Sequence, residues 1–284
     1  MKETKNQFSV CIKPKNKLFN LNLKEVWQYK DLIWLFVQRD FKTKYKQTIL
    51  GPLWFVIQPL FSTIVYTLIF GTIAGLSTDG TPSFLFYLAG NIPWLYFSSA
   101  LQNTSNIFVA NSNVFGKVYF PRLVAPISVT ITCIINFLIQ FVLFLIVWFC
   151  FFFSGAGITL TWAAAFLPLL ILQMAFLGLG AGIIVSALTT KYRDLQVLVT
   201  FGVSLWMYLT PVVDAASSLG GGLFYKAVMC NPMSPIIEII RYGWLGSGSI
   251  PWLYWGISWV VTLVLLFFGI IIFNKVEKNF MDTV

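Results

Sequence analysis

The chain alternates between short polar segments and long uncharged windows. After Lys46 no charged residue occurs until Asp79, and the 68 residues of segment 123–190 carry no charge at all. Because about 20 apolar residues cross the hydrocarbon core of a bilayer as a helix, such windows predict membrane-spanning helices. The pattern therefore predicts an all-α membrane protein.

Counting these windows predicts six transmembrane helices, with two of them in segment 123–190. A kink is expected at Asn91 and Pro93, because a proline removes one helical hydrogen bond. The glycine-containing stretch 154–157 is expected to form the hairpin between the third and fourth spans, and the small residues of the fourth span to allow close helix packing. The predicted spans are 53–76, 84–110, 123–153, 162–188, 195–211 and 252–273.

Segment 212–250 interrupts this pattern, because it is too apolar for a plain loop and too broken for a span. It predicts two short re-entrant helices, 223–230 and 233–245, in the outer leaflet between spans five and six. Such helices must be buried in protein or line a water-filled cavity. Glu238 and Arg241 lie three residues apart and are expected to form an ion pair. Together with Gly220, Gly221 and Gly222 they form a candidate outer gate.

Three regions are predicted along the chain. Residues 1–50 form a basic cytoplasmic arm, 51–274 form the transmembrane domain, and 275–284 form a cytoplasmic tail. Within the arm, apolar residues recur at helical spacing over 23–41, which predicts an amphipathic helix lying in the membrane interface. A helix of a small soluble domain is the alternative.

The distribution of charge fixes the orientation. The segments placed in the cytoplasm hold 17 of the 19 Lys and Arg residues, and 11 of these precede Leu50, whereas the outer segments hold only Lys226 and Arg241. Cytoplasmic loops of membrane proteins carry such an excess, so both termini are predicted to be cytoplasmic. The net charge of +9 therefore indicates contact with anionic membrane lipid or a partner, and nucleic acid is not expected.

The residue types exclude several kinds of chemistry. There is no histidine, the four cysteines are scattered, and the predicted spans contain no charged residue, which argues against a metal site and against ion-coupled transport. No phosphate-binding G-x-x-x-x-G-K-[ST] motif occurs. We therefore expect no catalytic residues and no cofactor in this chain, with ATP and Mg²⁺ bound by a separate ATPase subunit.

A set of short motifs follows in order along the chain: Arg39-Asp40, Tyr45-Lys46-Gln47, Leu50-Gly51-Pro52-Leu53-Trp54, Gln58-Pro59, Pro93-Trp94, Tyr119-Phe120-Pro121-Arg122, Arg193-Asp194, Pro211 and Asn231-Pro232-Met233. Over residues 30–274 these motifs resemble the permease subunit of ABC exporters for bacterial surface polysaccharides such as O-antigen, capsule and teichoic acid. The resemblance implies a homodimer in the bacterial cytoplasmic membrane that binds two ABC ATPase subunits. It also implies export of a polysaccharide carried on a polyprenyl-diphosphate lipid.

The resemblance also implies roles for particular residues. Segment 111–122 would be a coupling helix that contacts the ATPase, so the candidate coupling residues are Arg39, Asp40, Lys117, Arg122, Arg193 and Asp194. Simple membrane anchoring is the alternative for Lys117 and Arg122, and a solvated turn for Arg193 and Asp194. The family builds its channel from the first and fifth spans, which gives as aromatic channel candidates Trp54, Tyr66, Phe70, Trp206 and Tyr208. Packing or lipid contact is the alternative for each of these rings.

Two other functions fit parts of the pattern. One is a permease of the same architecture that exports a drug or a lipid. The other is a membrane glycosyltransferase acting on polyprenyl-linked sugars, which would need carboxylates at the membrane face for metal binding or general-base catalysis. Only Asp79, Asp214 and Glu238 are available on the predicted outer side, which disfavours the enzyme.

Overall fold

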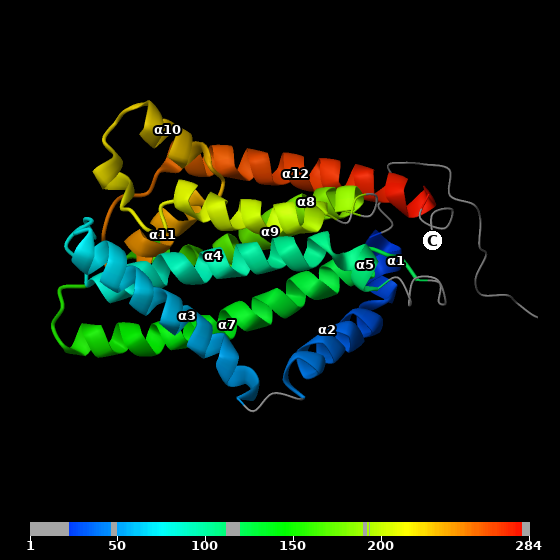
Figure 1. Ribbon diagram of the computed structural model, residues 1–284, viewed down its shortest axis with the longest axis horizontal. Coiled ribbons are helices and arrows are strands. Elements are labelled where there is room, and N and C mark those ends of the chain that lie inside the picture. The colour runs from blue at the N-terminus through cyan, green and yellow to red at the C-terminus, as the bar shows by residue number, and fades with distance from the viewer. Residues whose placement is uncertain (1–22, 47–49, 112–119, 190–191, 193, 280–284) are drawn as a thin grey trace, which may run out of the picture.

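The computed structural model describes residues 23–46, 50–111, 120–189, 192 and 194–279. Within these residues every regular element is helical (Figure 1), as the sequence predicts. The elements are α1 (Leu23–Gln28), α2 (Lys30–Tyr45), η1 (Gly51–Leu53), α3 (Trp54–Tyr66), η2 (Thr67–Ile73), α4 (Ser83–Ser105), α5 (Ile107–Ala110), α7 (Val124–Phe153), η3 (Trp162–Phe166), α8 (Leu167–Thr189), α9 (Leu195–Trp206), η4 (Met207–Leu209), η5 (Ala216–Leu219), α10 (Leu223–Cys230), α11 (Ser234–Leu245) and α12 (Trp252–Asn279).

The long helices run between two ends of a bundle. One end carries α10 and α11, with the turn between α7 and α8, and the other carries α1 and α5 (Figure 1). Helix α8 packs against both α4 and α12, while α4 packs against α7. Helix α3 crosses the bundle obliquely, in front of α7 in this view. Successive connections therefore return to alternate ends, as in a protein that crosses a membrane repeatedly.

Four helical stretches are long and apolar enough to span a bilayer: Gly51–Ile73, Val124–Phe153, Trp162–Thr189 and Trp252–Phe273. These correspond to the predicted first, third, fourth and sixth spans. The predicted fifth span lies in Leu195–Leu209, which is apolar but shorter. The second corresponds to α4, which has 23 residues and is therefore long enough, but is more polar than the others.

The polarity of α4 follows from its position. Of its 23 residues 17 are buried, because α3, α7, α8, α9 and α11 all pack around it. A helix enclosed by protein does not need an apolar surface toward lipid, so a hydropathy test undervalues it. Pro93 does not end α4, which continues from Ser83 to Ser105.

Small residues bring the bundle helices into close contact, as the sequence predicts. A Cβ atom added at Gly180 of α8 would lie 2.7 Å from the backbone nitrogen of Leu266 in α12. One added at Gly182 would lie 2.5 Å from the Cβ atom of Thr104 in α4. Side chains at these glycines would therefore push the helices apart.

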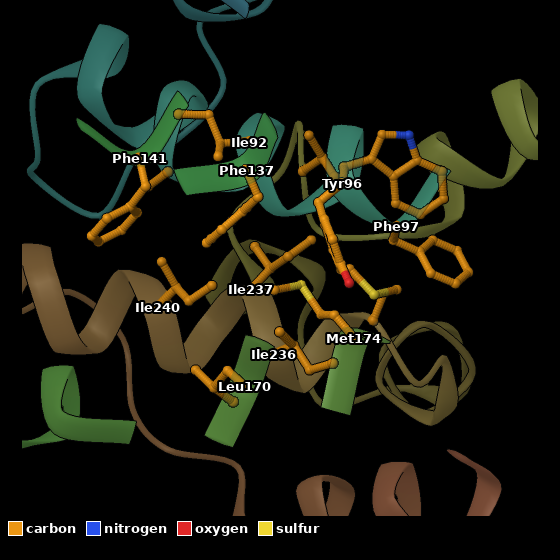
Figure 2. Packing of buried hydrophobic residues seen from close by; sticks show 14 of the residues in the cluster. Ile92, Tyr96, Phe97, Phe137, Phe141, Leu170, Met174, Ile236, Ile237 and Ile240 are labelled. Atoms are coloured by element: carbon orange, nitrogen blue, oxygen red, sulfur yellow. The ribbon is translucent and has the colours of Figure 1, made fainter. Parts of the chain in front are cut away.

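The main core contains α11 as well as the long helices. Figure 2 shows side chains from α4 (Ile92, Phe97), α7 (Phe137), α8 (Met174) and α11 (Ile236) packed together. Ten of the twelve residues of α11 are buried. This short helix is therefore an integral part of the bundle, at the end that also carries α10.

The predicted amphipathic helix is present as α1 and α2, separated at Tyr29. Val26, Phe36 and Val37 are buried, and α2 packs against α7. Trp27 and Trp34, by contrast, are 74% and 55% exposed. The helix pair thus covers the bundle with one apolar face and leaves two tryptophans outside.

Candidate functional site

Arg241 on α11 is the largest side chain that is fully buried in the described residues. Its Nη1 donates to the carbonyl oxygen of Pro211 at 2.6 Å and to that of Asp214 at 3.4 Å. Nη2 donates to the carbonyl oxygen of Val212 at 2.8 Å, and the guanidinium lies 3.5 Å from the ring centroid of Phe86. Arg241 therefore joins α11 and α4 to the segment that follows α9.

Glu238 and Arg241 form the ion pair that their spacing predicts, with Oε1 3.3 Å from Nη1. The carboxylate is also close to the backbone N–H of Ala216, from which it accepts a hydrogen bond. Burial raises the pKa of Glu238, and Arg241 opposes this only in part. Burial likewise lowers the pKa of Arg241 to about 10, so the guanidinium stays charged at neutral pH.

Asp214 and Asp79 lie at the same end of the bundle as this ion pair. Burial raises the pKa of Asp214, while the charge of Arg241 lowers it. Asp79 lies in the turn before α4, with a positive φ of 50°, and accepts a hydrogen bond of 2.6 Å from the Ser217 hydroxyl. Segment 210–219 is therefore contacted by polar groups from both sides.

The structure does not bring the predicted gate residues together. Glu238 and Arg241 are buried, whereas Gly220, Gly221 and Gly222 are exposed in the connection between η5 and α10. A Cβ atom added at any of the three glycines would meet no neighbouring atom within 4 Å. The main partners of Arg241 are instead backbone carbonyls of residues 211–214, which no pattern of side chains in the sequence would indicate.

Helices α3 and α9 bury few of their side chains. The buried residues of α3 are Pro59 and Thr63, and that of α9 is Val203. Large apolar side chains on both helices are exposed: Trp54, Phe61, Ile64, Val65, Val197, Leu198, Phe201 and Leu205. Both helices pack on α4, and the Tyr66 hydroxyl contacts the sulfur of Met207 at 3.4 Å. They thus present adjoining apolar surfaces.

Of the five aromatic channel candidates, two are exposed and three pack against the bundle. Trp54 and Tyr208 are 50% and 60% exposed on α3 and η4. Tyr66 and Phe70 are half-buried, with their ring centroids 6.1 Å apart, and pack against the core. Trp206 packs edge-on against Phe97, at 5.4 Å, and therefore points into the bundle.

At the opposite end of the bundle, Arg39 forms a surface ion pair with Asp40, with Nη2 2.7 Å from Oδ1. The same Nη2 donates to the side-chain oxygen of Asn111 at 3.2 Å, which ties α2 to the residue after α5. Arg122 is buried before α7, and Asp194 is exposed before α9. The other two coupling candidates, Lys117 and Arg193, lie outside the described residues.

An apolar cluster at this end was not predicted from the sequence. It joins α1 and α2 to α5, α7, α8 and α12. The Phe36 and Phe120 rings meet edge to face at 5.7 Å, and the Phe108 and Phe273 rings stack at 5.2 Å. Two features of the sequence indicate this cluster. They are the apolar face of 23–41 and the aromatic residues beside the polar segment 111–122.

The described residues contain no group of three or more Cys, Asp or Glu side chains arranged to hold a metal ion. Arg241 instead holds backbone segments together. A comparison with known families identifies what kind of bundle this is, because residues 31–245 match the model of the ABC-2 type transporter membrane domain. The chain belongs to the ABC-2 type transporter family.

The ABC-2 match begins at the start of α2 and ends at the last residue of α11. It therefore includes the buried Arg241 and both short helices α10 and α11. Within the curated proteins, the chain is 29% identical over 252 residues to the O-antigen export system permease protein RfbA of Klebsiella pneumoniae, covering 89% of this chain and 94% of that protein.

Two further relatives come from other organisms. The O-antigen export system permease protein RfbA of Myxococcus xanthus is 29% identical over 197 residues, which cover 69% of this chain and 73% of that protein. The polysialic acid transport protein KpsM of Escherichia coli is 24% identical over 257 residues, which cover 86% of this chain and 93% of that protein. The names of these relatives thus describe O-antigen export permeases and a polysialic acid transport protein.

Proposed function

We propose that this chain is the membrane-spanning subunit of an ATP-driven exporter that carries a polyprenyl-diphosphate-linked polysaccharide across the bacterial cytoplasmic membrane. The observation that carries the proposal is the alignment with O-antigen export permeases over 89% of this chain and 94% of the relative. O-antigen, capsule and teichoic acid are the candidate polymers.

The proposed topology has six spans, with α4 and Leu195–Leu209 added to the four apolar helices. Its support is that α4 is long enough to cross and that the connections return to alternate ends of the bundle. Helices α10 and α11 then re-enter the outer leaflet, where burial of α11 satisfies the requirement for protein contacts. The excess of Lys and Arg before Leu50 supports cytoplasmic termini.

The proposed assembly is a homodimer that binds two ABC ATPase subunits. The exposed apolar surfaces of α3 and α9 support it, because two such surfaces facing each other would enclose a channel. Polysaccharides present apolar C–H faces to aromatic rings, so the exposed Trp54 and Tyr208 are the better channel candidates. The export energy is assigned to the ATPase partners, which would bind ATP and Mg²⁺.

A deletion strain tests this function. The tagged chain is expected to co-purify with an ABC ATPase, and its deletion should cause lipid-linked glycan to accumulate on the cytoplasmic side. Reintroducing the chain should restore surface polysaccharide. If the purified complex instead moves a drug or a phospholipid and the deletion leaves surface polysaccharide intact, the proposal is wrong.

A further inference from the structure

Segment 210–219 continues from the outer end of α9 and is held by Arg241. We infer that Arg241 is the positioning residue that fixes this end of α9 against α4 and α11. The inference concerns the backbone of the segment, because Arg241 contacts carbonyl oxygens that any residue would provide. Its partners at Pro211, Val212 and Asp214 lie within four consecutive residues.

A guanidinium is well suited to binding several backbone carbonyls at once. Its donors form a rigid planar fork, which can engage several acceptors at once, whereas a lysine ammonium is a single point charge. The bonds to Pro211 and Val212, at 2.6 and 2.8 Å, are shorter than the 3.3 Å contact with Glu238. Two of the three backbone contacts are therefore closer than the ion pair, and the third, to the carbonyl of Asp214 at 3.4 Å, is about as long.

The space around the guanidinium is matched to it. Gly90 on α4 lies directly beside it, and a Cβ atom added there would be 2.8 Å from Nη2 and 3.2 Å from the carbonyl oxygen of Val212. The ring of Phe86 covers one face of the guanidinium at 3.5 Å. Only a residue without a side chain at position 90 leaves room for both Arg241 and the bound segment.

The rest of α9 has few buried side chains to hold it. Val203 is its one buried residue in the helix proper, and Met207 follows in η4. Beyond η4, the Asn231 amide donates to the Thr210 hydroxyl at 2.8 Å. The polar anchors of this helix are therefore gathered at its outer end, and Arg241 provides the buried ones.

Glu238 has a different part in this arrangement. It accepts the backbone N–H of Ala216 and partly balances the charge of Arg241. Because it touches none of the three bound carbonyls, a neutral glutamine at this position can preserve the anchor. Arg241 is therefore needed to hold segment 210–219, and Glu238 is not. If the ion pair itself were the gate, loss of either residue would have the same effect.

The consequence for export rests on the proposed function, because it takes α9 as a wall of the channel. A wall helix anchored at its outer end keeps the exit narrow while its inner part moves. Loss of the anchor should then open the exit and let small solutes pass in the absence of polymer. The anchor itself is tested separately, on the purified protein.

The test measures thiol accessibility at Val212, whose side chain is 0% exposed. The full-length Val212→Cys variant is purified in nanodiscs, with Cys11, Cys150 and Cys230 replaced by serine, and its reaction with a polar maleimide is timed. Adding Arg241→Gln should raise the labelling rate at least about tenfold, equivalent to about 1.4 kcal/mol in the opening equilibrium. Adding Glu238→Gln should change it less than about twofold, equivalent to about 0.4 kcal/mol.

Two further variants keep the test independent of whether Arg241→Gln folds. Gly90→Ala should raise the labelling rate of Val212→Cys by displacing the guanidinium. Gly202→Ala is the matched control on α9, because its added Cβ atom meets nothing within 4 Å, and it should leave the rate unchanged. Arg241→Lys should give an intermediate rate, since an ammonium replaces only part of the fork.

A second reporter distinguishes local release from general loosening. Ile158, in the turn between α7 and α8, is also buried, and Ile158→Cys should label slowly in every variant. Equal labelling of Val212→Cys in the Arg241→Gln variant and its parent would overturn the anchor, and so would equal acceleration at both reporters. If labelling behaves as expected but export and solute permeability do not change, the anchor stands and the channel role of α9 is wrong.

Discussion

The side-chain amide of Asn91, in the middle of α4, donates a 2.6 Å hydrogen bond to the hydroxyl of Ser62 in α3. Asn91 is 1% exposed, so this contact lies inside the bundle. It is a polar link between α4, the most enclosed of the long helices, and α3, one of the least enclosed. Buried hydrogen bonds between membrane helices are typically worth about 0.6 kcal/mol and at most about 1.7 kcal/mol.

The first prediction concerns this link. Asn91→Ala and Ser62→Ala should each lower the stability of the purified protein in detergent, and the double variant should lose less than their sum. The expected coupling is about 0.5–1.5 kcal/mol. Asn103 lies on the same helix but is exposed, so Asn103→Ala combined with Ser62→Ala should be additive. Additivity in both cycles would mean that the contact does not hold α3 to α4.

The second prediction concerns the contact between Phe36 of α2 and Phe120, next to the proposed coupling segment. Aromatic pairs of this kind contribute about 0.5–1.5 kcal/mol beyond the burial of their surface. Phe120→Ala should therefore weaken recovery of the ATPase complex up to about tenfold, or leave ATP hydrolysis no longer linked to export. Both are measured on the co-purified complex.

The control for this experiment is Phe149, an exposed aromatic residue at the opposite end of α7, which is 50% exposed. Phe149→Ala should leave assembly and ATP hydrolysis unchanged. If Phe120→Ala and Phe149→Ala behave alike, the aromatic cluster stabilises the fold without transmitting motion.

The third prediction concerns orientation. Cys230, at the end of α10, is exposed and is placed outside, whereas Cys11 is placed in the cytoplasm. In intact spheroplasts a membrane-impermeant maleimide should label a variant that retains only Cys230. A variant that retains only Cys11 should react after the membrane is opened. Labelling of Cys11 in sealed spheroplasts would reverse the proposed topology.

The fourth prediction concerns pH and Glu238. Because burial raises the pKa of this carboxyl in the folded protein, the folded state binds its proton more tightly than the unfolded state. Folding stability from this group is therefore greatest at low pH and is lost as the pH rises from the ordinary glutamate range through the raised pKa. Each unit of pKa difference corresponds to about 1.4 kcal/mol.

The measurement compares thermal unfolding of the native protein and Glu238→Gln between about pH 4 and pH 8, a range that starts near the ordinary pKa of a glutamate and extends above it. The variant should gain stability relative to the native protein as the pH rises. A difference that stays constant across this range would show that the Glu238 carboxyl has the same pKa in both states.

Much of this fold follows from local sequence. Uncharged windows set the ends of α7 and α8 to within a few residues, and the hairpin between them was placed correctly because Gly155 and Gly157 adopt positive φ angles. The spacing of Glu238 and Arg241 gave their contact, because three residues make nearly one helical turn. These features depend only on residues near one another in the chain.

The remainder depends on contacts between distant segments. Arg241 binds carbonyls about 30 residues earlier, and backbone acceptors leave no mark in a sequence. Trp206 lies on a helix with an exposed apolar surface, yet its ring packs inward against Phe97, and only the packing of α9 on α4 determines which way it points. Charge and periodicity place such residues on a helix but do not give the face.

The enclosed position of α4 has a consequence for how the chain is made. A nascent helix enters lipid on the strength of its own apolar surface, and α4 has Asn91, Gln102, Asn103 and several hydroxyl side chains instead. We expect it to remain poorly inserted until α8, which emerges later from the ribosome, covers it. Glycosylation mapping of chains truncated after residue 122 and after residue 190 should show weak insertion of α4 in the shorter chain and complete insertion in the longer one. Stable insertion of α4, the proposed second span, would then require that α8 has already been synthesised.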